Sequence, residues 1–294
     1  MELEQERLID EILWSNRATL RFQRRSWPPE IATLKSRLRR IWSAGDYDRL
    51  SRYLQIEVET FYRRLAVPSG SKLLDVACGS GELALIAARN GADATGVDIA
   101  ENVIERARER ARVEGLSARF YEADAEDLPF AEETFDVVTS VAGAMFAPRP
   151  DLAAKELLRV CRRGGVIALA NWTQQGFIGQ LFRIVSNFVA PSGMQEPLLW
   201  GDEAIVRGLL GASVSGVEVS RRNTVLNFPF PPSEVVRFFR LCYGPVNRAF
   251  ASLNRAGRVS LQAEMEELWS THNLARGGLT KVDAEWLEVM AKRA

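Results

Sequence analysis

The chain has 294 residues, 47% of them hydrophobic, which suffices for one large domain or for a domain with an elaborated cap. Its 38 basic and 38 acidic side chains balance, so no overall field draws the protein toward nucleic acid or an anionic membrane. The three widely spaced cysteines exclude a disulfide framework, and with the single histidine, His272, they offer no ligand set typical of zinc or non-haem iron. We therefore expect no metal.

The segment from Glu2 onward is charged, which is not typical of a secretory signal. No apolar run approaches the ~20 residues that cross a bilayer. We therefore expect a cytoplasmic protein without a membrane span. The sequence leaves a homodimer open.

The first 66 residues are predicted to form a helical lid. Apolar residues recur at helical spacing over 3–25, and further helices are expected over 30–43 and 48–65. Trp27-Pro28-Pro29 ends the first helix, because proline cannot continue it. Basic residues outnumber acidic ones from Arg17 to Arg52. This excess indicates solvated faces of lid helices, and a surface for an acidic substrate or RNA is the alternative.

Residues 67–172 alternate between strand and helix patterns, as a parallel sheet with right-handed crossovers requires. Short apolar runs bounded by glycine, proline or polar residues predict the strands. These strands are expected at 72–77, 93–98, 117–121, 135–140 and 165–171. The intervening helices are expected at 81–90, 101–114 and 150–162.

The pattern changes after residue 172. Helices are expected over 175–190 and 202–210, and a sixth strand near 213–221. The stretch from Pro229 to His272 is mostly helical in pattern and rich in phenylalanine and leucine. Residues 284–291 alternate between apolar and polar at the period of a strand.

A glycine turn after the first strand predicts a cofactor that contains a nucleotide. Gly79 and Gly81 allow backbone N–H groups to approach a ligand, and the helix behind them favours a negative group at its N-terminus. Asp98 ends the next strand, where a carboxylate can accept hydrogen bonds from two ribose hydroxyls. The turn also satisfies the dinucleotide fingerprint, so a nicotinamide-dependent oxidoreductase is an alternative.

Four segments, in order, resemble the motifs of class I S-adenosylmethionine-dependent methyltransferases. They are Leu74–Gly81 around the glycine turn, Ala123–Phe130, Phe135–Ser140 and Leu158–Gly165. The resemblance covers about residues 45–172 and is closest to bacterial small-molecule and quinone-type methyltransferases. Asp75, which precedes the glycines, would repel the pyrophosphate of a dinucleotide but suits the ammonium group of S-adenosylmethionine. Ala77 stands where many members have glycine.

The resemblance implies an α/β, Rossmann-like, doubly wound sheet of seven strands, mostly parallel, with the last strand antiparallel between the fifth and sixth. It implies a lid over 1–66, a cofactor-binding core over 67–172, a cap over 173–282 that includes the sixth strand, and a final strand over 283–294. It also implies S-adenosyl-L-methionine as cofactor and S-adenosyl-L-homocysteine as product. The cofactor-binding residues it implies are Asp75, Ala77, Cys78, Gly79, Ser80, Gly81, Asp98, Ile99, Asp124, Ala125, Ser140 and Val141.

The segment after the fourth strand narrows the class of methyl acceptor. Residues 139–146 contain no Asn-Pro-Pro-Tyr-like tetrapeptide, no Pro-Cys pair and no acidic cluster, which weakens nucleic-acid and catechol acceptors. Aromatic residues crowd the segments after 172, which suits a small, partly apolar acceptor. The residues expected to bind it are Tyr47, Met145, Phe146, Trp172 and Tyr243.

Methyl transfer from a sulfonium is an in-line displacement that needs positioning more than acid–base chemistry. A general base, if one is used, would be Tyr47, Tyr243 or His272. A protein that binds S-adenosylmethionine without catalysing transfer is a further alternative.

Overall fold

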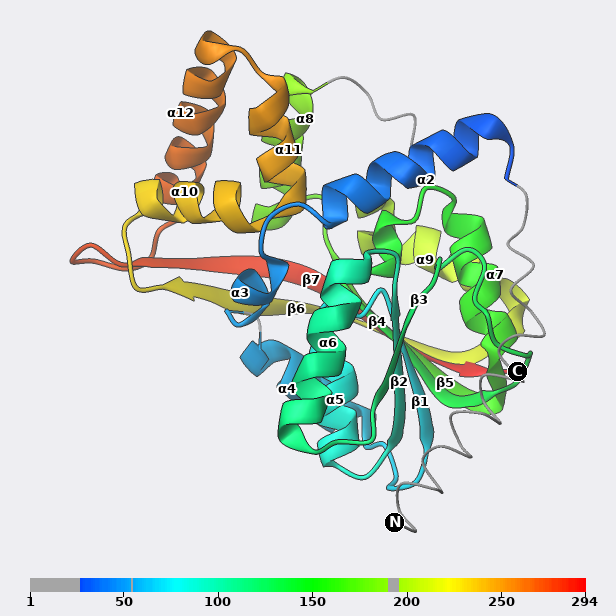
Figure 1. The fold of residues 1–294 in the computed structure, drawn as a ribbon. Coiled ribbons are helices and arrows are strands. Elements are labelled where there is room, and N and C mark those ends of the chain that lie inside the picture. Colours follow the sequence, from blue (N-terminus) through cyan, green and yellow to red (C-terminus); the bar gives the residue numbers. More distant parts are fainter. Residues whose placement is uncertain (1–26, 54, 190–195) are drawn as a thin grey trace.

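The computed structural model describes residues 27–53, 55–189 and 196–294, and the helix expected over 3–25 lies outside them. A seven-stranded sheet in the order β3-β2-β1-β4-β5-β7-β6 forms the centre of the molecule (Figure 1). Its strands are β1 Lys72–Val76, β2 Asp93–Asp98, β3 Arg119–Glu122, β4 Phe135–Val141, β5 Cys161–Trp172, β6 Val214–Phe228 and β7 Thr280–Arg293.

The strand pairing confirms the predicted sheet. The first five strands are parallel to one another, and β7 pairs antiparallel with both β5 and β6. The last strand of the chain therefore lies between the fifth and the sixth, as predicted.

Helices cover both faces of the sheet (Figure 1). Alternation of side chains along β1 decides which residue faces which layer, so Leu73 packs with α4, α5 and α6 while Leu74 packs with α7. The helices of the first layer are α4 Gln55–Leu65, α5 Glu82–Arg89 and α6 Glu101–Glu114. Those of the second are α7 Pro150–Val160 and α9 Glu203–Leu210.

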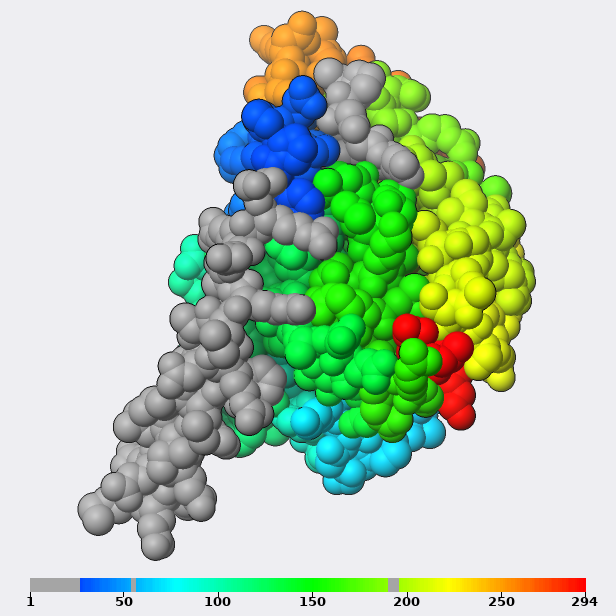
Figure 2. Space-filling model, turned by 90° about the vertical axis from the view of Figure 1, so that its right-hand side faces the viewer, coloured from blue at the N-terminus to red at the C-terminus, as the bar shows by residue number. Residues whose placement is uncertain are grey.

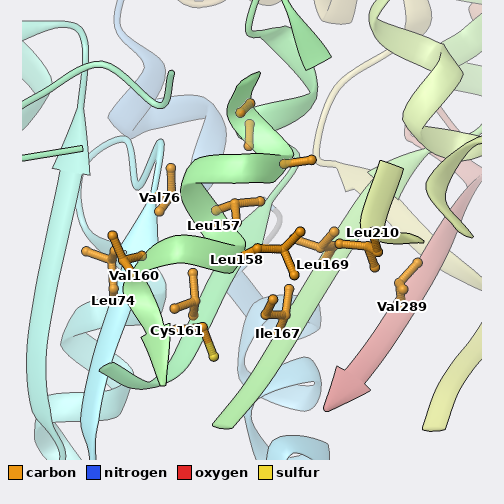
Figure 3. Packing of buried hydrophobic residues seen from close by; sticks show 14 of the residues in the cluster. Leu74, Val76, Leu157, Leu158, Val160, Cys161, Ile167, Leu169, Leu210 and Val289 are labelled. Carbon is orange, nitrogen blue, oxygen red and sulfur yellow. The ribbon is translucent and has the colours of Figure 1, made fainter. Parts of the chain in front are cut away.

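The second layer encloses the apolar cluster drawn in Figure 3, where Leu157 and Leu158 of α7 lie over Ile167 and Leu169 of β5. The C-terminal residues lie at the surface beside this layer, in red in Figure 2. There the guanidinium of Arg293 donates to the carbonyl oxygens of Leu158 and Ser213, at 3.1 and 2.9 Å. These bonds hold the end of β7 against the layer.

The cap consists of α8 Phe177–Phe188, α10 Pro232–Cys242, α11 Gly244–Ser252 and α12 Arg255–Thr271. These helices pack on a part of β6 and β7 that extends beyond the other strands (Figure 1). The extension buries Leu226, Phe228, Val282 and Ala284 against the cap. Residues 222–228 and 280–282 thus belong to the sheet, whereas the sequence pattern suggests that they lie in the cap.

Between cap and sheet lie α2 Pro29–Trp42 and α3 Tyr47–Ser51 (Figure 1). Short 3-10 turns complete the described chain at Ala144–Phe146, Pro197–Gly201 and Gly211–Ser213. Pro29, Pro150 and Pro232 each stand at the start of a helix, where the missing N–H has no intrahelical role. None of the described helices is both long and apolar enough to cross a bilayer.

Candidate functional site

The glycine turn lies at the carboxyl end of β1 and is held by the neighbouring strand. The N–H of Cys78 donates to the carbonyl oxygen of Val97 at 2.9 Å. The carboxylate of Asp98 accepts hydrogen bonds from the N–H of Gly79 at 3.0 Å and of Ala100 at 2.9 Å. The turn needs positive φ at Gly79 (54°) and Gly81 (83°), which glycine adopts without strain.

Ala77 also has a positive φ, of 56°. This is the position where the resembling family often has glycine, and the backbone conformation explains that preference. The turn keeps its shape with alanine there.

Asp75 lies beneath the turn, on β1. The residue is 3% exposed, and its carboxylate accepts a hydrogen bond of 3.2 Å from the hydroxyl of Thr139 on β4. Burial, and next the charge of Asp98, raise the pKa of Asp75 to about 7, although the Thr139 bond opposes the rise. Burial also raises the pKa of Asp98. Two carboxyl groups with raised pKa values therefore flank the turn, which favours a cationic ligand beside them.

A large open cavity, with about 1500 Å³ of empty volume, lies over this edge of the sheet. Ten of the twelve predicted cofactor residues line it: Asp75, Ala77, Cys78, Gly79, Ser80, Asp98, Ile99, Asp124, Ala125 and Val141. The other two, Gly81 and Ser140, do not. Gly81 precedes the first turn of α5, and the hydroxyl of Ser140 donates to the carbonyl of Val76 and accepts from the N–H of Ala144.

The cavity wall offers polar groups to a ligand. The hydroxyl of Ser80 is buried and has no hydrogen-bond partner among the described residues. A buried hydroxyl without a partner is costly, so its position in the wall fits a ligand with polar atoms.

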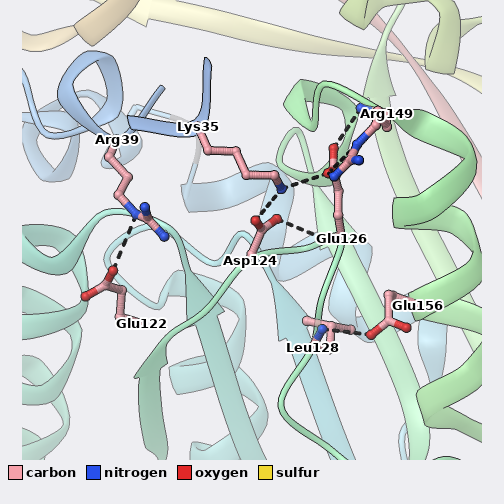
Figure 4. Close-up of polar contacts among 8 residues, drawn as sticks. All are labelled: Lys35, Arg39, Glu122, Asp124, Glu126, Leu128, Arg149 and Glu156. Carbon is pink, nitrogen blue, oxygen red and sulfur yellow. Dashed lines mark hydrogen bonds and ion pairs between the residues drawn. The ribbon is translucent and has the colours of Figure 1, made fainter. Parts of the chain in front are cut away.

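A buried charge cluster meets the cavity at Asp124 (Figure 4). Lys35 of α2 is 2% exposed and pairs with the carboxylates of Asp124 and Glu126. Arg149 binds the same Glu126 through its backbone N–H at 2.7 Å and its guanidinium Nε at 2.9 Å. Asp124, predicted to contact the cofactor, is thus tied to the N-terminal helix. The sequence pattern did not identify Lys35, because a lysine in a basic helix resembles a solvated one.

A second, apolar chamber of about 530 Å³ adjoins the cavity. The two share Trp42, Tyr47, Ala142, Phe146 and Trp172 in their walls. The chamber is otherwise lined mainly by residues of the cap and of β6, among them Leu181, Leu226 and Tyr243. Four of the five predicted acceptor residues therefore line one or both spaces. The fifth, Met145, is 1% exposed and packs in the core with α7.

The predicted candidates for a general base lie in different surroundings. Burial raises the pKa of Tyr47 to about 12, and that of Tyr243 well above its usual value, so both phenols keep their protons at neutral pH. They suit hydrogen-bond donation rather than proton removal. His272 ends α12 beside Phe177, with ring centroids 5.5 Å apart, and is not among the residues that line either space. Among the described residues no group of acidic, histidine or cysteine side chains has the arrangement of a metal site.

This sheet order, with a glycine turn and an acid at the carboxyl ends of β1 and β2, is the architecture of a Rossmann-like methyltransferase. A family model of the methyltransferase domain matches residues 74–169. An uncharacterised protein of Mycobacterium tuberculosis is 35% identical over 244 residues, which cover 81% of this chain and 89% of that protein.

Two further comparisons also point to methyltransferases or to their fold. The demethylmenaquinone methyltransferase of Thermus thermophilus is 34% identical over 157 residues, or 50% of this chain and 71% of that protein. The crystal structure of YcgJ from Bacillus subtilis shares the fold, with a TM-score of 0.56 at 18% identity over 81% of this chain and 98% of that one. The chain belongs to the class I S-adenosylmethionine-dependent methyltransferases and is an enzyme of that class.

Proposed function

We propose that the protein binds S-adenosylmethionine in the large cavity and transfers its methyl group to a small, partly apolar acceptor in the aromatic chamber. The observation that carries this proposal is the shared wall. Trp42, Tyr47, Phe146 and Trp172 border both spaces, so ligands in the two would meet there. The cavity has the acidic groups that a cationic cofactor needs, and the chamber has none besides phenols.

Three groups of residues would hold the cofactor. Asp98, already fixed by the N–H groups of Gly79 and Ala100, would accept from the ribose hydroxyls. Asp124 and the backbone of Ala125 would contact the adenine. Asp75 would face the ammonium group, which favours its ionised form. When bound, the cofactor supplies the electrophilic methyl group.

The residues of the chain would hold the two reactants in place and keep water away from them. The aromatic side chains shared by the cavity and the chamber would exclude water. They would also hold the acceptor in line with the methyl group of the cofactor. Such positioning can supply ~7–11 kcal/mol of the barrier. Tyr47 and Tyr243 would orient the acceptor through their retained protons.

The test has a binding and a transfer stage. S-adenosylmethionine and S-adenosylhomocysteine should raise the melting temperature, and at a hundred times the Kd the added stability should be ~2.7 kcal/mol. NAD and NADP should not. Transfer of radiolabelled methyl groups to a library of small acceptors then tests catalysis. A melting shift with NAD alone would support the oxidoreductase alternative, and binding without any transfer would support a catalytically silent protein.

A further inference from the structure

Helix α2 brings a buried cation to Asp124, the acid of the cavity wall that would contact adenine. The ammonium group of Lys35 pairs with Oδ2 of Asp124 and, at 2.7 Å, with Oε2 of Glu126. Lys35 is 2% exposed and is not among the described residues that line the cavity. Asp124 lines it, and 14% of its side-chain surface is accessible. A ligand in the cavity therefore meets the carboxylate, with the lysine behind it.

Further contacts hold the ammonium group of Lys35 in place. It lies over the ring of Trp27, 4.5 Å from the ring centroid, and the guanidinium of Arg149 lies 4.1 Å from the same centroid. Arg149 also binds Glu126, as Figure 4 shows. The cluster thus has two cations and two carboxylates, and its charges balance. Asp124 is held in it as an ionised carboxylate with a fixed position.

The remaining hydrogen-bonding capacity of Asp124 defines what it can bind. An ionised carboxylate only accepts hydrogen bonds, at about two sites on each oxygen. Oδ1 accepts from the N–H of Glu126 at 3.0 Å, and Oδ2 accepts from Lys35. The sites that are left require a donor on the ligand. The 6-amino group of adenine is a donor, whereas a 6-oxo purine presents a carbonyl oxygen there, which a carboxylate repels.

We propose that Lys35 is the positioning residue that makes the cavity selective for a 6-amino purine. It acts through Asp124, which it keeps ionised and in place, and does not itself contact the cofactor. A buried carboxylate that loses its cation favours the protonated form, and in that form it can donate to a 6-oxo group. This inference rests on the proposed function, because it takes adenine as the ligand of Asp124.

Two cofactor products that differ at position 6 of the purine test the inference. They are S-adenosylhomocysteine, with an amino group, and S-inosylhomocysteine, with an oxo group, titrated by calorimetry. The unaltered protein should bind the amino compound at least tenfold more tightly. Lys35→Met should weaken its binding by about tenfold and that of the oxo compound much less, so that the ratio of the two Kd values falls several-fold. A purely structural role of Lys35 would weaken both ligands alike and leave the ratio unchanged.

Arg39→Met is the matched control on the same helix. The guanidinium of Arg39 pairs with Glu122 at 3.5 Å, and neither residue lines the cavity, so both affinities should stay unchanged. If circular dichroism shows that Lys35→Met does not fold, Lys35→Gln takes its place, because it keeps a neutral donor opposite Asp124 and removes only the charge. The same fall in the ratio is expected.

The outcomes separate this inference from the proposed function. Equal affinity of the unaltered protein for the two compounds, or an unchanged ratio in the folded Lys35 variant, would overturn the role of Lys35 and leave the proposed function standing. Failure of the unaltered protein to bind S-adenosylhomocysteine would overturn the proposed function and this inference with it.

Discussion

The buried lysine of the N-terminal helix should be far more important for stability than its exposed neighbour. Lys35→Met keeps most of the side-chain volume but removes the charge that Asp124 and Glu126 share. Glu126 retains Arg149, whereas among the described residues the carboxylate of Asp124 loses its cation and keeps the N–H of Glu126 at 3.0 Å. Breaking a buried ion pair costs 3–5 kcal/mol, and with one carboxylate still paired we expect about 3 kcal/mol.

Arg39→Met is the matched control, one turn further along α2. The guanidinium of Arg39 is 3.5 Å from Glu122, and the two side chains are 39% and 34% exposed (Figure 4). An exposed pair of this kind contributes about 0–1 kcal/mol. Urea unfolding followed by circular dichroism measures both variants from the shift of the midpoint.

A double variant separates lost charge from lost packing. Lys35→Met with Asp124→Asn removes both members of the pair, so no buried charge is left unpaired at that position. It should recover part of the stability that Lys35→Met loses, because a neutral pair costs less than a lone charge. Equal losses for Lys35→Met and Arg39→Met, or no recovery in the double variant, would refute the reasoning.

Three further outcomes are expected. The pKa of Asp75 is about 7 in the folded protein against 3.8 for the free group, so the folded state keeps a proton that the unfolded state releases. The free energy of unfolding should therefore fall by up to about 1.4 kcal/mol per pH unit as pH rises from about 4 to 7, and Asp75→Asn, measured by urea unfolding across that range, should remove this slope. Asp98→Asn should lower the calorimetric affinity for S-adenosylhomocysteine at least tenfold, because charge-assisted hydrogen bonds contribute ~1.5–3 kcal/mol each, and an unchanged affinity would place the ribose elsewhere. Gly81→Ala puts a Cβ 2.7 Å from the ring of Phe120, whereas the Cβ of Gly115→Ala meets nothing within 4 Å, and φ is positive at both positions. Gly81→Ala should therefore destabilise the protein by about 1–3 kcal/mol more than Gly115→Ala. Equal melting temperatures of the two variants would refute this.

The sheet was predictable because its determinants are local. β1, β4 and the second half of β5 contain short apolar runs, and the glycine turn comes directly after the first of them in the sequence. The place of β7 came from the resemblance to a family rather than from its own residues. The extension of β6 was missed, although Thr224, Leu226 and Phe228 are buried and alternate with exposed residues. Their burial depends on cap helices on both sides of β6 in the chain, α8 before it and α10 to α12 after it, so this part of β6 resembles cap sequence.

The residues around the two cavities were harder to find, and for the same physical reason. Lys35 is 89 residues away from Asp124, and nothing near it in sequence distinguishes it from the solvated basic residues of α2. Thr224 and Trp286 come together in the wall of the large cavity only when β6 and β7 pair. Local motifs position the cofactor turn, because backbone geometry alone can form it. The walls of the two cavities combine side chains from distant parts of the chain, so they become visible only in the folded structure.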